Sequence, residues 1–364
     1  MIEGEPEDLP AANRRPVLGR AAKTVVKIAV GGILVYVLLS RVNLGALSQA
    51  LVSANVATLA VAFVALVFTV SLNATRWRII VAQLGGRVSI RMALAGTFEG
   101  MFFNLFLPTN VGGDAARAYR AYDRGVPLGT AVASGLADRA VGLASVMGLL
   151  LVGSLVAPGF SRIPSFWLIT VFSAVGLVAA VALAWAGRVL VMRKLWPPLR
   201  LVAQALNAFS IVIFSRRLFT HVLPITIVAN LANCFVLWSC ARAAGLQLTY
   251  PDAVVVLEAS SLAAILPISF GGWGVREGAT AALLSALGNS MTASIAASIL
   301  YAGILVAVGC LGAAVWIANP YRLKVAGGLF NRRTTHRRPA VDRVSRSAEP
   351  DLPVRSDAHS AASS

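Results

Sequence analysis

The sequence EGMFFNLFLPTNVGGDAAR (residues 99–117) is followed later in the chain by a related stretch, EASSLAAILPISFGGWGVR (residues 258–276). Both stretches begin with Glu, contain a Leu-Pro pair and a Gly-Gly pair at the same places, and end with Arg. These six identities compare with roughly one expected by chance in a window of this size. An ionisable side chain in an apolar segment costs several kcal/mol in a membrane and is usually retained for function. The pattern therefore predicts an internal repeat that carries polar groups into a membrane.

The composition of the chain is typical of a protein embedded in a lipid bilayer. Hydrophobic residues make up 57% of the sequence and charged residues 13%, and the mean hydropathy is +0.76. Soluble domains contain roughly 45–50% apolar residues. A helix needs about 20 residues to cross a bilayer, and six apolar runs approach or exceed that length. These runs lie near 24–40, 55–74, 128–157, 164–187, 219–244 and 291–318.

Two shorter apolar runs contain the repeated motif. The runs 91–107 and 252–266 end at the Pro and Gly-Gly of each copy, and a second short piece follows each of them, 114–123 and 273–287. Pro removes a helical hydrogen-bond donor, and Gly-Gly permits a tight reversal of the chain. Each copy is therefore predicted to be a re-entrant helical hairpin, which reaches the middle of the membrane and returns.

The distribution of basic residues predicts the orientation of the chain. The sequence has 32 Lys and Arg residues against 15 Asp and Glu, but the segments 158–163 and 245–251 contain only one basic residue between them. The positive-inside rule assigns the basic loops and both termini to the cytoplasm. This assignment holds at every loop only if both hairpins are re-entrant and open to opposite sides. The predicted fold is thus an all-α polytopic membrane protein, with about six full spans and two re-entrant hairpins in an inverted-topology repeat.

The domain organisation follows from the same pattern. Residues 1–23 are predicted to be a disordered cytoplasmic N-terminus, 24–320 a transmembrane domain of the cytoplasmic membrane, and 321–364 a disordered basic cytoplasmic tail. The first run is interpreted as an uncleaved span, with a signal peptide as the alternative. Residues 188–217 have apolar residues at helical spacing and predict an amphipathic helix at the inner surface. The basic loops and tail are expected to attract anionic lipid headgroups.

Several chemistries are excluded by the residues present. The cysteines, Cys234, Cys240 and Cys310, lie within apolar runs without CxxC spacing, so no metal site or disulfide framework is predicted. Histidines are few and scattered, and no phosphate-binding loop of the nucleotide-hydrolase type occurs. The net charge of +17 is spread along the spans without interleaved aromatics, which argues against nucleic acid as a partner. We therefore expect no metal, no cofactor and no catalytic residues.

The repeated motif predicts an anion site at mid-membrane. Backbone N–H groups at the turn and the positive end of the short helix that follows suit an anion such as a lipid phosphate. Arg117 and Arg276 lie about one helical turn beyond the reversal. Glu99 and Glu258 accept a substrate amine, carry a coupling proton, or pair with Arg117 and Arg276 inside each hairpin; these alternatives stay open. An ion pair within each hairpin is the structural interpretation of the same residues.

Other polar and aromatic residues of the spans have structural interpretations. Asn73, Asn104, Asn230 and Asn233 are predicted to form interhelical hydrogen bonds. Trp77, like other aromatic residues near the ends of apolar runs, is predicted to be an interfacial anchor.

The motifs together resemble a known family. NLFLPTNVGGDAAR (104–117), the Asp138-Arg139 pair and LPISFGGWGVRE (266–277) resemble the lysylphosphatidylglycerol synthase transmembrane, or flippase-like, family over about 20–320. Asp138 departs from the Glu expected in many relatives. The resemblance implies a lipid flippase region, and aminoacyl transfer, which a soluble domain performs in bifunctional relatives, is not expected here. The predicted substrate-binding residues are Glu99, Asn104, Gly112, Gly113, Asp114, Arg117, Asp138, Arg139, Glu258, Gly271, Gly272, Arg276 and Glu277.

Three functions are compatible with these features. The first is a translocator that moves a phospholipid, an aminoacylated lipid or a polyprenyl-linked glycolipid across the cytoplasmic membrane. The second is an integral-membrane phosphatase acting on a polyprenyl diphosphate, for which PGFSR (158–162) offers a weak phosphate-loop match. The third is a non-transporting scaffold for a lipid-modifying enzyme. The first is the leading hypothesis, with a membrane lipid as substrate.

Overall fold

The computed structural model describes residues 48, 52, 54–106, 112–163, 166–190, 206–265 and 274–318. Within these residues the regular structure is helical, and no strand occurs among them, as the all-α prediction requires. The chain divides into two units, Met1–Tyr321 and Arg322–Ser364. All of the described residues lie in the first unit.

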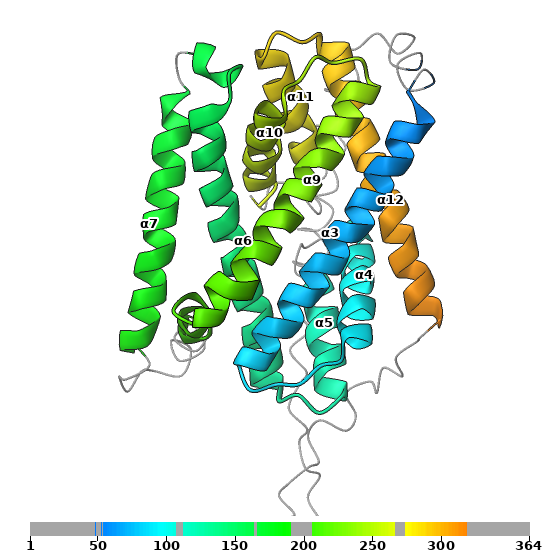
Figure 1. Ribbon diagram of the computed structural model, residues 1–364. Coiled ribbons are helices and arrows are strands. Elements are labelled where there is room, and N and C mark those ends of the chain that lie inside the picture. Colours follow the sequence, from blue (N-terminus) through cyan, green and yellow to red (C-terminus); the bar gives the residue numbers. More distant parts are fainter. Residues whose placement is uncertain are drawn as a thin grey trace, which may run out of the picture. The chain divides into compact units, whose positions relative to one another are not determined.

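Among the described residues, five helical segments are long and apolar enough to cross a membrane. At about 1.5 Å of rise per residue, their 23–29 residues extend roughly 35–44 Å, more than the ~30 Å hydrocarbon core. They coincide with five of the six predicted spans, and the remaining run, 24–40, lies outside the described residues. The elements are α3 (Val56–Gln83), α6 (Leu128–Val156), α7 (Trp167–Leu190), α9 (Leu223–Ala243) with the π-helical turn η2 (Leu218–Val222) before it, and α12 (Met291–Ala318) (Figure 1).

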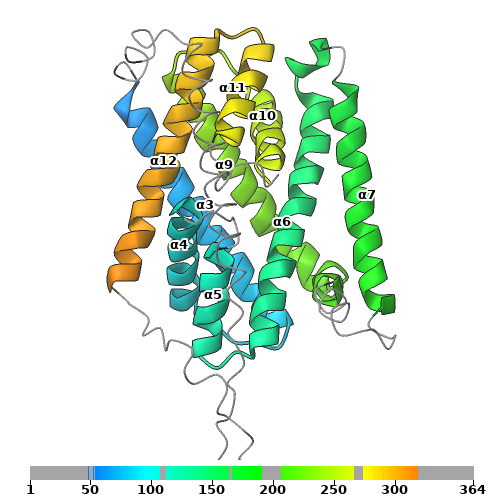
Figure 2. The same ribbon diagram turned by 180° about the vertical axis from the view of Figure 1, so that it is seen from behind.

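Four helices are too short to cross the hydrocarbon core. They contain 12–17 residues, so each is roughly 18–25 Å long. They are α4 (Ile90–Phe106), α5 (Gly112–Asp123), α10 (Tyr250–Ala263) and α11 (Val275–Ala286). In Figures 1 and 2, α4 and α5 lie side by side toward one end of the helical array, and α10 and α11 lie toward the opposite end.

The order of long and short helices occurs twice. A long, a short, a short and a long helix follow one another as α3 to α6 and again as α9 to α12. The loops 84–89 and 244–249 have the same length, and so do 124–127 and 287–290. Each of these loops has one glycine with positive φ, a conformation that favours glycine, and it lies at the same place in the paired loops. The glycines are Gly85, Gly245, Gly125 and Gly288.

Side-chain caps and one glycine fix where several helices begin. The Asn55 side chain accepts hydrogen bonds from the N–H groups of Ala57 and Thr58 at the start of α3. Thr249 caps α10. Gly274, with φ of 81°, precedes α11, and its N–H donates to Glu277 Oε2 at 2.7 Å. Each cap satisfies a backbone donor that has no partner within its own helix.

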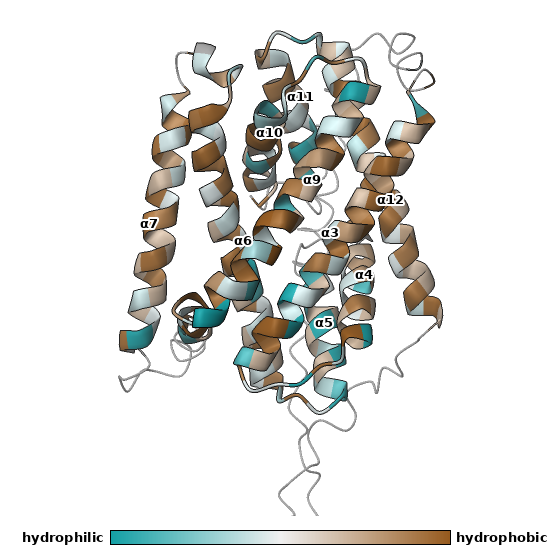
Figure 3. Cartoon of the chain, in the orientation of Figure 1, coloured by the Kyte–Doolittle hydropathy of each residue, from teal (hydrophilic) through white to brown (hydrophobic). Residues whose placement is uncertain are grey.

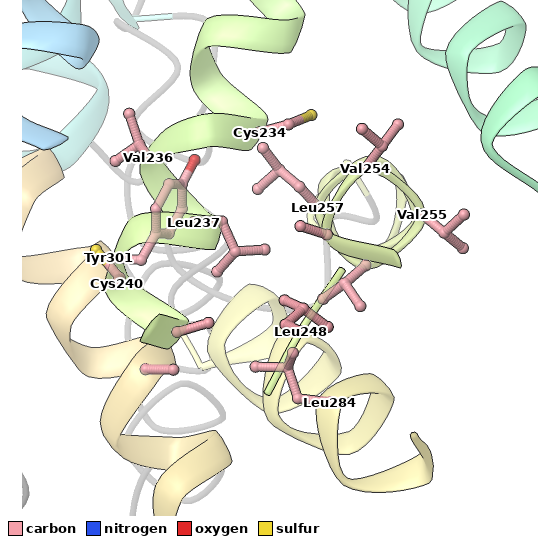
Figure 4. Close-up of a cluster of buried hydrophobic side chains, with 14 of the residues drawn as sticks. Cys234, Val236, Leu237, Cys240, Leu248, Val254, Val255, Leu257, Leu284 and Tyr301 are labelled. Carbon is pink, nitrogen blue, oxygen red and sulfur yellow. The ribbon is translucent and has the colours of Figure 1, made fainter. Parts of the chain in front are cut away.

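The largest buried cluster joins the second set of helices. Figure 4 shows Leu237 of α9, Leu257 of α10, Leu284 of α11 and Tyr301 of α12 gathered around one centre. The outer surface is also apolar: Figure 3 shows hydrophobic colouring along most of α7 and α12, and α7 exposes large side chains such as Phe172. An exposed apolar face of this extent is explained by contact with lipid chains.

Close contacts between helices depend on small residues. A Cβ added to Gly312 of α12 would lie 2.0 Å from the carbonyl oxygen of Phe98 in α4. A Cβ added to Gly113 of α5 would lie 2.2 Å from the carbonyl oxygen of Gly100 in α4. Because both obstacles are backbone atoms, neither clash can be relieved by a side-chain rotation. Glycine therefore lets α4 pack directly against both α12 and α5.

Replacement of Gly312 by Ala is expected to lower the free energy of unfolding by about 1–3 kcal/mol, because α4 and α12 must separate. Gly303 of the same helix provides the control, since a Cβ there meets nothing within 4 Å. Both changes bring the same gain in helix propensity, so thermal unfolding of the two variants in detergent isolates the clash. Equal unfolding temperatures for the two variants would contradict this packing.

Candidate functional site

A polar cavity of about 290 Å³ lies among α3, α4, α5, α6, α11 and α12. Its charged lining comes from four helices, and two amide side chains, Asn73 of α3 and Asn104 of α4, also line it. Arg117 and Arg276, the arginines that end the two copies of the repeated motif, line this same cavity. The charged lining residues are Arg76 of α3, Asp114 and Arg117 of α5, Asp138 of α6 and Arg276 of α11.

Asp138 is the centre of a buried ion-pair network. Its Oδ1 atom lies 2.7 Å from Arg76 Nε, and its Oδ2 atom lies 3.4 Å from Arg117 Nη1. All three side chains are about 90% buried or more. The carboxylate of α6 thus holds one guanidinium from α3 and one from α5 at the cavity.

Asp114 extends the network to the edge of the site. It forms ion pairs with Arg117 in the same helix and with Arg139 of α6, whose side chain is 44% exposed. Arg76, Arg117 and Arg139 carry three positive charges, whereas Asp114 and Asp138 carry two negative charges. Counted over these described residues, the network has a formal surplus of one positive charge, which favours an anion in the cavity.

Arg117 is also held by an aromatic ring. Its guanidinium carbon lies 5.4 Å from the ring centroid of Trp77, within the range of a cation–π interaction. Trp77 is 1% exposed, and its Nε1 donates to Ser134 Oγ at 3.2 Å. The prediction of an interfacial anchor is therefore wrong for Trp77. Because α3 continues to Gln83, Trp77 lies more than a turn before the helix end and faces the interior.

The end of α4 is tied to the beginning of α5 beside the cavity. Asn104 Oδ1 accepts a hydrogen bond from the N–H of Gly113 at 2.8 Å. Gly112 and Gly113 are the first residues of α5, so the positive end of this helix is at the site. Residues 107–111, which join the two helices, lie outside the described part.

Arg276 is held differently from its counterpart in the first copy. Its Nη2 atom lies 2.5 Å from Glu277 Oε1, and its guanidinium carbon lies 5.7 Å from the ring centroid of Tyr301. The hydroxyl of Tyr301 donates to Asn233 Oδ1 at 3.2 Å. Glu277 both pairs with Arg276 and caps α11 through Gly274. Within the described part of the chain, the contacts of Arg276 thus include the Glu277 carboxylate and the ring of Tyr301.

The ion pair of Glu99 with Arg117, one of the alternatives that the sequence left open, is not formed. Glu99 is fully buried, and its Oε1 atom lies 2.9 Å from Arg120 Nη2. Glu99 lies seven residues before the end of α4 at Phe106, and Arg120 lies eight residues after Gly112. In an antiparallel pair these two residues are level with each other. Arg117 is three residues nearer the turn, about 4.5 Å along the helix axis.

The alternative of an ion pair between Glu258 and Arg276 is not formed either. Glu258 is buried in α10 and accepts a hydrogen bond from Cys234 Sγ of α9 at 3.6 Å. No cation lies within 4 Å of its carboxylate among the described residues. Glu258 is five residues before the end of α10, whereas Arg276 is at the second residue of α11, so they differ in depth by about 6 Å.

The predicted site residues thus fall into three groups. Asn104, Gly113, Asp114, Arg117, Asp138 and Arg276 line the cavity, and Gly112, Arg139 and Glu277 lie beside lining residues. Glu99 and Glu258 are outside the lining, in the packing of α4 and α10. Gly271 and Gly272 lie outside the described residues.

Arg76 lines the cavity but is not among the residues that the sequence predicted for the site. Arg120, the partner of Glu99, was not predicted either and lies outside the lining. The feature that identifies Arg76 is its place in α3, one turn before Ile80 and Val81. Both of these side chains are fully buried, so the inward-facing side of the helix continues beyond Arg76.

The predicted interhelical hydrogen bonds are present for three of the four asparagines. Asn230 Nδ2 donates to Ser145 Oγ at 3.1 Å, joining α9 to α6. Asn233 joins α9 to α12, and Asn104 joins α4 to α5. Asn73 Oδ1 is buried without a hydrogen-bond partner among the described residues.

The long apolar helices and the buried charged cavity define a polytopic helical membrane protein with an internal polar site. Residues 24–312 match the family described as Lysylphosphatidylglycerol synthase TM region, and the chain belongs to this family. No curated protein matches the sequence. Membership supports a lipid-related membrane function.

Proposed function

We propose that this protein translocates a lipid with a phosphate-bearing headgroup across the cytoplasmic membrane. The observation that carries the proposal is that Arg117 and Arg276, from the two copies of the motif, line one cavity. Arg76 and the positive end of α5 add to the attraction for an anion. A guanidinium binds phosphate through two parallel hydrogen bonds, which makes arginine suited to this headgroup.

The proposal includes an inverted-topology repeat. In it, α4 with α5 and α10 with α11 are re-entrant hairpins that enter from opposite sides of the membrane. Their lengths, their places at opposite ends of the array and the repeated long–short–short–long order support this topology (Figures 1 and 2). Broken helices that meet near the middle of the membrane place irregular backbone where it borders a polar cavity.

Transport is tested with the full-length protein in liposomes that contain fluorescent phosphatidylglycerol or a fluorescent polyprenyl phosphate. The expected result is movement of intact labelled lipid between leaflets, measured with a membrane-impermeant quencher. Protein with both Arg117→Gln and Arg276→Gln is the matched control and should leave the label in its original leaflet. No movement of either lipid by the unchanged protein would reject the proposal.

The phosphatase alternative has less support from the geometry. The N–H of Gly159, in the segment PGFSR, donates to Asp252 Oδ1 at 3.0 Å, and Phe160 is buried. Pro158 lies about 20 residues beyond Asp138, roughly 30 Å along α6. Release of inorganic phosphate from a polyprenyl diphosphate in the same liposomes would favour that alternative over transport.

The topology gives a separate prediction. Single cysteines replacing Arg87 and Arg124 should react with an impermeant thiol reagent only from the cytoplasmic side. Cysteines replacing Gln247 and Ser290 should react only from the outside. All four residues are exposed in the loops of the two hairpins, and the three native cysteines are first replaced by Ser. Labelling of Gln247→Cys from the cytoplasm would contradict the inverted repeat.

A further inference from the structure

A second cavity, of about 410 Å³, lies where α3 ends and η2 begins. It shares no lining residue with the central cavity. Three arginines, Arg78, Arg87 and Arg217, and His221 line it, and the rest of its lining is apolar or backbone. We call this cavity the basic pocket.

The arginines of the basic pocket have no carboxylate partner within the described part of the chain. Arg76, one residue earlier, lies 2.7 Å from Asp138, but no ion pair involves Arg78, Arg87 or Arg217 there. Three like charges around one cavity repel one another unless an anion lies between them. The charge of the pocket therefore points to an anionic ligand.

Hydrogen bonds position two of the ionisable side chains of the basic pocket, Arg78 and His221. Arg78 Nε donates to the carbonyl oxygen of Val88 at 3.3 Å, which ties the end of α3 to the following loop. His221 Nδ1 lies 2.6 Å from Thr220 Oγ1, so the ring is oriented by its neighbour. His221 belongs to the π-helical turn η2, and such turns occur frequently at functional sites.

The equivalent place in the other half of the repeat has no such charge. Counting from the positive-φ glycines Gly85 and Gly245, the positions of Arg78, Arg87, Arg217 and His221 correspond to Trp238, Gln247, Ala57 and Val61. The positive-inside rule accounts for basic residues on one side of the membrane. It does not require that three arginines from separate segments line one cavity.

We propose that the basic pocket binds the headgroup of a lipid that carries more than one negative charge, such as a phosphomonoester. A lipid is the source because the pocket lies at the ends of two candidate spans, Val56–Gln83 and Leu218–Ala243, where headgroups meet the helices. Basic pockets between transmembrane helices bind anionic headgroups in this way. A multiply charged phosphate accepts hydrogen bonds from several guanidinium groups at once. This site is separate from the proposed transport cavity.

The test uses the full-length protein in detergent and native mass spectrometry with added phosphatidic acid. The double variant Arg87→Gln with Arg217→Gln removes two charges without touching the hydrogen bond between Arg78 and Val88. Its affinity for phosphatidic acid is expected to fall roughly tenfold or more. Arg242→Gln is the matched control, because Arg242 is an exposed arginine at the opposite end of α9, and it should bind as the unchanged protein does.

Each other outcome decides against part of the proposal. Unchanged binding of phosphatidic acid by the double variant, at an unchanged unfolding temperature, would overturn the site. Equal affinity for phosphatidylglycerol would overturn the class of headgroup. Displacement of the lipid by inorganic phosphate at equal concentration would assign the pocket to a soluble anion.

If the double variant unfolds, the single variant Arg87→Gln repeats the test, because Arg87 is exposed in a loop. Its unchanged affinity would overturn the site equally. Transport activity enters none of these measurements, so failure of the transport proposal leaves this test intact.

Discussion

Replacement of Asp138 by Asn is expected to abolish transport and to destabilise the protein strongly. The carboxylate of Asp138 is 4% exposed and pairs with Arg76 and Arg117. Asn keeps the shape of the side chain but leaves two buried guanidinium groups with one negative charge fewer between them. Breaking a buried ion pair in this way costs about 3–5 kcal/mol. Thermal unfolding in detergent measures the loss of stability, and the liposome assay measures transport.

Two further variants separate charge from local packing. Asp123→Asn at the exposed end of α5 removes the same charge outside the network, and it should leave both measurements unchanged. Asp138→Glu keeps the charge and should retain part of the transport activity, with a smaller loss of stability. An unfolding temperature of Asp138→Asn equal to that of the unchanged protein would show that Asp138 does not hold the two arginines.

Much of the fold could be predicted because the thickness of the bilayer sets the length of the apolar run that each spanning helix needs. The runs 55–74, 128–157, 164–187, 219–244 and 291–318 agree with five helices of the structure, although α3 continues nine residues beyond the predicted end. Arg76 and Trp77 lie in that extension, and their inward orientation could not be predicted from hydropathy alone. A buried arginine lowers the hydropathy of its segment as much as an exposed one does.

The site could be predicted only in part, because the sequence does not show how far along its helix each residue lies from the turn. The repeated motif identified Arg117 and Arg276, and the family resemblance added Asp138, all of which line the cavity. An ion pair of Glu99 with Arg117 was one of the open alternatives, but pairing in a hairpin depends on equal distances from the turn. These distances are known only when the helix ends are known. The motif gives the number of residues between Glu99 and Arg117 but not the residues at which α4 ends and α5 begins, so the level of each side chain could not be derived from it.

The two halves of the site are related but differ in charge. Asp138 and Tyr301 each lie 13 residues after a positive-φ glycine, at equivalent positions of α6 and α12. Asp138 pairs with Arg117, and the ring of Tyr301 lies near Arg276. Asp114 and Glu277 are both at the third residue of the short helix that precedes these long helices, α5 before α6 and α11 before α12. Among the described residues, Arg117 forms ion pairs with two carboxylates, Asp114 and Asp138, and Arg276 forms an ion pair with Glu277.

Arg276→Gln is expected to abolish transport while the protein still folds and inserts. The side chain of Arg276 is 20% exposed, and α11 keeps its cap because Glu277 still accepts from Gly274. Arg276→Lys should transport weakly, since an ammonium group cannot form the two parallel hydrogen bonds that a guanidinium forms with phosphate. The liposome assay measures transport, and protein recovered from the membrane fraction measures insertion.

A double variant distinguishes substrate binding from charge balance. Arg276→Gln alone leaves the Glu277 carboxylate without the arginine that lies 2.5 Å from it. Adding Glu277→Gln removes that charge and preserves the cap, because a Gln side chain also accepts from the N–H before the helix. If Arg276 only balances Glu277, the double variant should transport better than Arg276→Gln. If Arg276 binds the lipid phosphate, both variants remain inactive, and full recovery in the double variant would reject that role.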